Sequence, residues 1–559
     1  MAIAGTAIYG DDTENPYLEP YFSGILAKMK RFIDRTYYSG GGYGEPFGYE
    51  NMATRDLVEA LFVLERNFGI DYTSTTNIKN LYLYPLHGAY SDGTMPGYGD
   101  VHIGGRWSWG GNPFLWLSYR MKNPWTAHFT QPALLEGSGN LFKYLWYTTG
   151  LDTKQREELI PSHHFPVKGT MFMRSGWSDE GTILAFKSGP NSNHYHLDQG
   201  SLIMMTNGEL LLSEAGLESI RGFQAYYGNP YYRAYDIQAM GHNVMIVDGD
   251  PESQAPADYE NGIAALRNFP RNIHSFAGWN FDEVEGDLSS VYKGKLSKYT
   301  RSLLFVKPDI FILFDRVTSP EDHFFSWIFH AEDVDGESSI TKEGNRVSII
   351  RPKARLDMDV LSPTITSSRI RPAIHHETFI QLTSERGLTD AEFLAVMVPK
   401  ALTSISDTAP QFSSSLITET GWIGAKIEKE GSTTRVYFRT GRPESSSVNG
   451  YTTDAERFAV VTDQHDNVIS MFLIGSSLSD GSTSISSSIH VSVSVAYTSE
   501  GVEMEVDAEE AVDVSVNVPS RPSSVKVNEI SVKNWNYEAA TGVIKIRLPT
   551  GHVVVKMLR

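Results

Sequence analysis

Three ionisable side chains, His194, His196 and Asp198, alternate along one short stretch of the sequence. The stretch leads directly into two apolar runs, residues 201–206 and 209–212, which are separated by an Asn-Gly pair. Such a pair between two short apolar runs predicts a β-hairpin with a type I′ turn. Because residues i, i+2 and i+4 of an extended segment share one face, we expect the three side chains to project together from the entrance to this hairpin.

The predicted strands bring two further side chains to the same place. Glu214 follows the returning strand of the hairpin, and His242 precedes another apolar run, residues 244–247. Two imidazoles and a carboxylate around one open position suit Zn²⁺. We therefore expect a structural Zn²⁺ at His196, Glu214 and His242, and no organic cofactor. For His242, a capping hydrogen bond at the start of a strand is the alternative.

The order and spacing of several motifs resemble the heparinase II/III-like family of polysaccharide lyases. The match is tight over residues 169–248 and looser over most of the chain. The residues that carry it are Met173-Arg-Ser-Gly-Trp177, His194-Tyr-His-Leu-Asp-Gln-Gly200, Asn207-Gly208, Glu214-Ala-Gly216 and Gly241-His-Asn-Val-Met-Ile-Val-Asp248. The family usually has Asp where this chain has Glu214, so a carboxylate is retained at that position.

The resemblance implies cleavage of a uronic-acid-containing polysaccharide by β-elimination. Tyr49 matches the tyrosine that abstracts or returns a proton, and His194 matches the imidazole that acts in acid–base chemistry or neutralises the substrate carboxylate. We expect these two rings to face each other across a sugar-sized gap. Tyr227 is our choice for a second proton donor, and its neighbours Tyr226 and Tyr231 are the alternatives.

Four other residues are candidates for contacts with the substrate. Asn193 and Arg233 can bind a carboxylate, although a solvated side chain is the alternative for Arg233. Tyr98 and Trp107, in a loop rich in glycine and aromatic residues, can stack on sugar rings. Packing between helices is the alternative for both of these aromatic residues.

The chain changes character near Pro161. Apolar residues at helical spacing predict helices over residues 21–34, 51–65 and 141–147, and short alternating strands follow. We expect an α+β multidomain fold with a helical domain over residues 1–155, an antiparallel β-sandwich domain over 160–480, and a small C-terminal β domain over 481–559. The resemblance implies that the helical domain is an incomplete α/α toroid followed by stacked antiparallel β-sandwich domains. We expect a homodimer, or a companion chain or segment, to complete the toroid.

Composition limits the function and the location. The net charge of −19 argues against nucleic-acid binding, and no apolar run is long enough to span a membrane. The chain has no cysteine, which excludes disulfides and thiolate chemistry. Its start lacks the basic region of a signal peptide. We expect a protein of the periplasm or the extracellular space, with no signal peptide in this chain, that acts on an acidic polysaccharide.

Three other functions remain open from the sequence. A glycoside hydrolase needs two opposed carboxylates, for which Glu45, Glu50 and Asp100 are candidates. A uronyl C5-epimerase shares the proton abstraction but expels no leaving group. A glycan-binding protein without catalytic activity is the third alternative.

Overall fold

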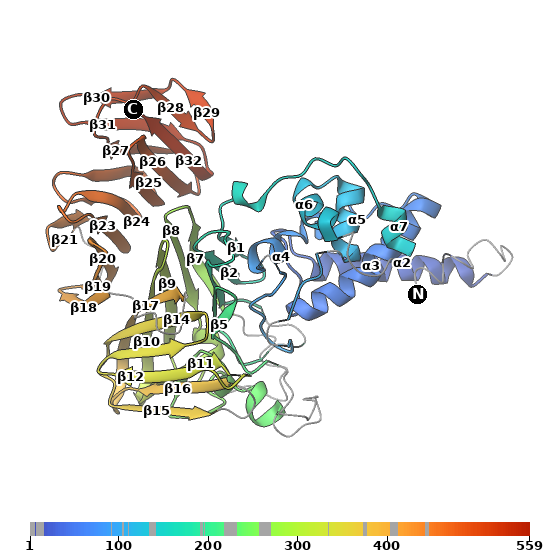
Figure 1. Cartoon of the computed structure of the whole chain (residues 1–559), viewed down its shortest axis with the longest axis horizontal. Helices are drawn as coiled ribbons and strands as arrows, with labels where there is room; N and C mark the ends of the chain where they lie inside the picture. The colour runs from blue at the N-terminus through green and yellow to red at the C-terminus, as the bar shows by residue number, and fades with distance from the viewer. Residues whose placement is uncertain are drawn as a thin grey trace.

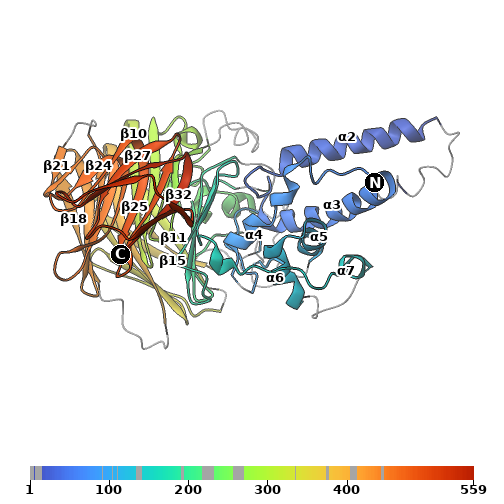
Figure 2. The same cartoon turned by 90° about the horizontal axis from the view of Figure 1, so that it is seen from above.

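The computed structural model describes Thr6 and residues 16–559, except for residues 91, 103–104, 110, 134–140, 191–193, 195, 217–231, 256–269, 334, 373–376, 403–411 and 442–445. Its helices gather at one end and its strands at the other (Figures 1 and 2). The predicted α+β fold, helices first and antiparallel sheets after them, is confirmed. No helix in the described ranges combines the length and the apolar character that crossing a membrane requires.

The helices pack on one another through aromatic side chains. The α-helices are α2 (Leu18–Thr36), α3 (Phe47–Phe68), α4 (Leu83–Gly88), α5 (Asn112–Met121), α6 (Pro124–Ala133) and α7 (Leu141–Trp146). Shorter turns of other helix types are η1 (Asn77–Asn80), η2 (Arg156–Glu158), η3 (Tyr232–Asp236), η4 (Ala239–Gly241) and η6 (Ser289–Tyr292). The three helices expected from the sequence correspond to α2, α3 and α7. Pro46 precedes α3, so Tyr49 lies in its first turn.

A five-stranded antiparallel sheet carries residues 194–200, called the motif stretch below, between its third and fourth strands. Its strands are β1 (His163–Phe165), β2 (Thr170–Arg174), β3 (Thr182–Lys187), β4 (Leu202–Thr206) and β5 (Glu209–Leu212), paired in this order. Asn207 and Gly208 join β4 to β5 with φ angles of 49° and 76°. Positive φ at both central residues defines a type I′ turn, so the predicted hairpin is confirmed.

Two further antiparallel sheets pack against the first. The four-stranded sheet contains β6 (Met245–Val247), β11 (Phe325–Glu332), β15 (Ser367–Pro372) and β16 (Glu377–Thr383). The eight-stranded sheet contains β7 (Arg271–Ala277), β8 (Phe281–Asp287), β9 (Lys298–Val306), β10 (Ile310–His323), β12 (Ser339–Glu343), β13 (Arg346–Ile350), β14 (Ala354–Ser362) and β17 (Leu388–Ala401).

The last part of the chain forms one large sheet of fifteen strands. These are β18 (Phe412–Glu419), β19 (Trp422–Lys429), β20 (Ser432–Arg439), β21 (Ser446–Val448), β22 (Tyr451–Thr453), β23 (Arg457–Thr462), β24 (Val468–Ser479), β25 (Ser484–Tyr497), β26 (Gly501–Ala508), β27 (Val512–Asn517), β28 (Ser524–Val527), β29 (Ile530–Val532), β30 (Trp535–Glu538), β31 (Val543–Leu548) and β32 (Gly551–Leu558). The boundary expected at residue 481 falls between β24 and β25, which pair with each other in this sheet. The division of the chain into three domains stays a prediction.

Buried side chains join these parts as layers. One core lies between the five-stranded sheet and the eight-stranded sheet and includes Phe186 and Phe305. A second core joins the helices to the other face of the five-stranded sheet and includes Phe172, Ala185 and Trp116. The eight-stranded sheet packs its opposite face on the fifteen-stranded sheet. The five-stranded sheet is therefore covered on both faces, and the motif stretch lies where it meets the helices.

Candidate active site

The rings of Tyr49 and His194 meet between the helices and the five-stranded sheet. Their centroids are 3.7 Å apart and their planes are inclined by 9°, so the rings are stacked. Both side chains are partly exposed. The structure thus brings together the two residues that the sequence selected. It corrects the expected sugar-sized gap, because two flat rings in contact bury their faces against each other.

Asp100 holds both histidines of the motif. His194 Nδ1 lies 3.0 Å from one carboxylate oxygen of Asp100, and His196 Nε2 lies 2.8 Å from the other. The Tyr232 hydroxyl donates to the same carboxylate at 3.2 Å. Burial would raise the pKa of Asp100, but the hydrogen bonds from the two imidazoles outweigh it, so this pKa is lowered. The carboxylate is therefore ionised and accepts a hydrogen bond from each imidazole.

The backbone fixes the same contact. Asp100 donates its N–H to the carbonyl of His194 at 2.9 Å. Gly99 precedes it with a φ of +77°, and a Cβ atom there would lie 2.3 Å from the His194 oxygen. His194 itself has a φ of 67°, which is rare for a residue with a side chain. The backbone at Gly99 and Asp100 is therefore held in close contact with the backbone at His194.

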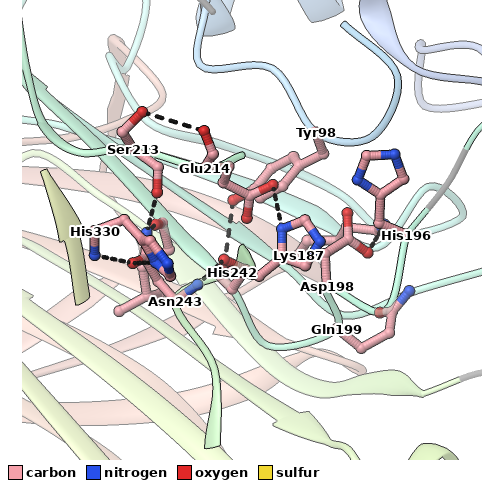
Figure 3. A network of polar contacts seen from close by, with 12 residues as sticks. Tyr98, Lys187, His196, Asp198, Gln199, Ser213, Glu214, His242, Asn243 and His330 are labelled. Atoms are coloured by element: carbon pink, nitrogen blue, oxygen red, sulfur yellow. Dashed lines mark hydrogen bonds and ion pairs between the residues drawn. The ribbon is translucent and has the colours of Figure 1, made fainter. Parts of the chain in front are cut away.

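The three residues expected to hold Zn²⁺ are buried close to one another (Figure 3). His242 Nδ1 lies 3.2 Å from a Glu214 oxygen, and the rings of His196 and His242 are 5.2 Å apart. Burial lowers the pKa of His242 to about 3 and raises that of Glu214 well above its usual range. The donor types suit the metal. As they lie, however, no group of three or more His, Cys, Asp or Glu among the described residues has a geometry that could hold one.

A buried ammonium group lies beside these residues. Lys187, at the end of β3, forms an ion pair with Asp198, and both side chains are at most 2% exposed. Burial lowers the pKa of Lys187, although the adjacent carboxylates of Asp198 and Glu214 act against this shift. The ion pair with Lys187 holds the Asp198 side chain at the end of β3.

A second buried charge fixes the loop to the eight-stranded sheet. Arg301 makes two bonds to Asp315, of 2.8 and 2.7 Å, and donates its remaining nitrogen to the carbonyls of Gly200 and Asn243 at 2.6 and 3.0 Å. Asn243 in turn donates to the carbonyls of Leu202 and Ser213, each at 2.6 Å. This network positions Gly200, the last residue of the stretch that begins at His194, and Asn243, the residue that follows His242.

Two of the predicted substrate contacts are corrected. Tyr98 and Trp107 are 4% and 2% exposed. The Tyr98 hydroxyl donates to the carbonyl of Ser201, and Trp107 packs on Phe47. Buried rings cannot offer a face to a sugar, so both residues support the loops of the site, as the packing alternative stated.

The other predicted residues are placed only in part. The Arg233 side chain is exposed on η3, next to Tyr232. Asn193 and Tyr227 lie outside the described residues, as do Tyr226 and Tyr231. The contact of Tyr232 with Asp100 was not predicted from the sequence. The high density of tyrosines in this segment was the feature that could have indicated it. Asp100 was considered only as a carboxylate for hydrolysis.

Comparison with known proteins extends the match beyond the motif stretch. Residues 158–405 match the family model described as heparinase II/III-like, C-terminal. A search of curated proteins found no match. Among solved structures, a heparinase III is similar with a TM-score of 0.58 at 14% identity, over 83% of this chain and 64% of that one.

Two other solved structures share the fold. The heparan sulfate lyase HepC from Pedobacter heparinus has a TM-score of 0.60 at 15% identity, over 79% of this chain and 65% of its own length. A chondroitin AC lyase from Streptomyces coelicolor A3 has a TM-score of 0.50 at 9% identity, over 97% of this chain and 76% of its own. The chain thus spans less than two thirds of the length of the heparinase III and of HepC. Residues 158–405 are thus similar to the C-terminal part of heparinase II/III-like proteins, as the motifs of the sequence indicated.

Proposed function

We propose that this protein is a polysaccharide lyase that cleaves a uronic-acid-containing glycan by β-elimination. The observation that carries the proposal is the contact between Tyr49 and His194 beside the ionised carboxylate of Asp100. The reaction removes the proton at C5 of the uronate, forms a double bond between C4 and C5, and breaks the bond from C4 to its oxygen. It needs a base, an acid and a group that stabilises the developing negative charge.

The contacts of His194 favour one division of these tasks. Because the ionised Asp100 accepts from Nδ1, that nitrogen carries the hydrogen and Nε2 keeps its lone pair. In our proposal Nε2 takes the C5 proton and the Tyr49 hydroxyl returns one to the departing C4 oxygen. Tyr227 as a second donor, and Asn193 and Arg233 as contacts of the uronate carboxylate, complete the proposed site.

A glycoside hydrolase is less well supported. Its mechanism needs two carboxylates that flank the scissile bond. Asp100 accepts from two imidazoles, and Glu50 is fully buried. A location outside the cytoplasm belongs to the proposal, because uronate polysaccharides are extracellular polymers.

The proposal is tested with a panel of alginate, heparan, chondroitin, hyaluronan and ulvan. We expect ultraviolet absorbance from the unsaturated uronyl product on at least one of them. His194→Ala and Tyr49→Phe should each lower the rate by at least about 100-fold. Tyr144→Phe, at a site 81% exposed on α7, and His465→Ala, in an exposed turn, are the matched controls.

Two outcomes would overturn the proposal. New reducing ends without that absorbance would indicate hydrolysis. No reaction on any of the five polymers would favour binding without catalysis, or epimerisation, which exchange of the C5 hydrogen with solvent deuterium detects.

We also propose that His196, Glu214 and His242 hold Zn²⁺. Their burial and donor types support this, and His196 would have to turn from Asp100 toward the other two. The metal would brace the hairpin and take no part in the elimination. Metal analysis of the purified chain should find about one zinc, and chelation should lower the melting temperature. A chain free of zinc, with a melting temperature that chelation leaves unchanged, would contradict this proposal.

A further inference from the structure

A second cluster of polar side chains shares no residue with the candidate active site. It lines a cavity of about 890 Å³ between β1, β7 and the strands β24, β25 and β26 of the fifteen-stranded sheet. Small-molecule sites commonly have volumes of about 300–1,000 Å³. The cavity is therefore large enough to admit a ligand the size of a disaccharide.

His274 and Ser492 on the cavity wall form a hydrogen-bonded pair with a buried carboxylate behind it. His274 Nε2 lies 2.8 Å from Ser492 Oγ, and His274 Nδ1 contacts Glu283. Glu283 is fully buried, and its other oxygen lies 2.7 Å from Arg457. Burial would raise the pKa of Glu283, but the charge of Arg457 and the interaction with His274 Nδ1 outweigh it, and this pKa is lowered. Glu283 is thus an ionised acceptor.

The carboxylate decides which nitrogen of His274 carries hydrogen. Because Glu283 can only accept, Nδ1 donates to it. In the neutral imidazole, the lone pair of Nε2 then accepts the hydroxyl hydrogen of Ser492. This is the arrangement that activates a serine as a nucleophile. It recurs on unrelated folds and is recognised by its geometry.

A second serine–histidine pair in the same cavity shows the contrast. His164 Nδ1 lies 2.8 Å from Ser275 Oγ, and the Asn272 amide donates to His164 Nε2 at 2.8 Å. His164 therefore donates to the Ser275 hydroxyl and cannot take its proton. Of these two pairs, only Ser492–His274 is arranged for nucleophilic attack.

We propose that Ser492, His274 and Glu283 form a second catalytic site that hydrolyses carboxylic esters. Ser492 Oγ attacks the ester carbonyl as its proton passes to His274 Nε2, and the alcohol departs with that proton. Water then attacks the acyl-serine, giving its proton to His274, which returns it to Ser492 Oγ. The net reaction turns an ester and water into a carboxylic acid and an alcohol. The amide of Asn272 and the imidazole of His490 line the same cavity and can donate to the oxyanion.

The charge of the cavity selects the kind of ester. Asp507, Glu509 and Glu510 line it, and its described lining contains no Lys or Arg. A polyanionic chain would be repelled, so the substrate is an acyl ester of an uncharged or cationic molecule. The proposed lyase acts on anionic chains, so the two activities require different molecules.

The test uses the full chain and a fluorophosphonate probe, which labels activated serines. Peptide mass mapping of the labelled protein should place one adduct on Ser492. Labelling should disappear in His274→Ala and Ser492→Ala and persist in Ser275→Ala, the matched control from the other pair. Hydrolysis of p-nitrophenyl acetate should fall more than about 100-fold in Ser492→Ala and stay within about twofold of wild type in Ser275→Ala.

Either of two results would overturn the inference. The first is wild-type protein that carries no adduct on Ser492. The second is a Ser492→Ala variant that hydrolyses the ester as fast as the wild type. The first result is obtained on the wild-type protein, so it does not depend on whether the variants fold.

Discussion

Asp100 shows how one buried side chain sets the chemistry of two others. Each of its oxygens accepts from a different imidazole, and its own N–H donates to the backbone of His194. The carboxylate thus fixes the orientation and the tautomer of His194. Partners of this kind, which hold reactive groups in place, typically change activity by about 10- to 100-fold when they are removed.

We therefore predict that Asp100→Asn lowers the turnover of the uronate polymer about 10- to 100-fold and changes KM little. The amide cannot accept from both imidazoles, so His194 loses its fixed tautomer. Asp92→Asn, in the same loop but at an exposed ion pair with Arg106, is the control and should retain activity. Equal kcat values for the Asp100 and Asp92 variants would contradict the role of Asp100.

At this scale the sequence predicted the residues whose type and spacing are distinctive. The alternating histidines and the resemblance to the family selected His194 and Tyr49, and the two rings do meet. Asp100 lies 94 positions from His194, so no local pattern connects them. Lys187 ends a strand that reads as apolar, and nothing near it in the sequence indicates its pairing with Asp198. Buried ion pairs are set by tertiary contacts, which a single sequence does not show.

The loop that carries Asp100 depends on a glycine. At Gly99 a side chain would clash with the His194 carbonyl, whereas at Gly69, the end of α3, a Cβ atom would meet nothing within 4 Å although φ is equally positive. An alanine at either position would therefore suffer the same backbone strain, about 1–2 kcal/mol. Only Gly99 adds the steric clash, worth about 1–3 kcal/mol.

We predict that Gly99→Ala lowers the free energy of unfolding more than Gly69→Ala does and also removes the lyase activity. Chemical denaturation of both variants measures the difference. If the two alanines cost the same and both variants remain active, the close approach at His194 does not matter.

The short strand β1 carries two histidines whose pKa values are lowered by burial. Burial lowers the pKa of His163 and of His164 from 6.5 to about 4. Since the unfolded chain binds these protons first, their stabilising contribution is present above about pH 6.5 and is lost as the pH falls toward 4. Each imidazole contributes up to about 3 kcal/mol to this change.

We predict that the free energy of unfolding falls between pH 6.5 and pH 4, and that His163→Gln makes the fall shallower. Urea denaturation at several pH values measures it. His490→Gln, at a site 53% exposed, should leave the change of the unfolding free energy with pH as it is in the wild type. An unchanged slope in the His163 variant would show that this imidazole does not set the pH response.

Elements with local signals were predictable, and their assembly was not. The Asn-Gly turn and the helical spacing near Tyr49 depend on neighbours in the sequence, and both are confirmed. The strands after residue 481 belong to a sheet that begins before that residue, because β25 pairs with β24. Strand partners are chosen by contacts that are distant along the chain, so the extent of this sheet could not be read from its segments.

The molecule as a whole carries a net charge of −19, and its proposed substrate is also anionic. Repulsion between the two slows their encounter, and salt screens it over about 8 Å at physiological ionic strength. We predict that kcat/KM on the uronate polymer rises severalfold from low salt to about 0.15 M, while kcat changes little. Initial rates across a salt series measure this. A decrease with salt would mean that a local cluster of positive charge governs binding.

The fork that Arg301 makes to Asp315 also reaches Gly200 and Asn243, so it joins the ends of two site segments to the central sheet. Opening either segment would leave the buried guanidinium paired with Asp315 but would remove one of its two carbonyl acceptors, at about 1–3 kcal/mol. Local breathing there is therefore suppressed. Amide hydrogens beside Gly200 should exchange with solvent only as slowly as the whole molecule unfolds, and the candidate site should hold the same geometry with and without a bound glycan.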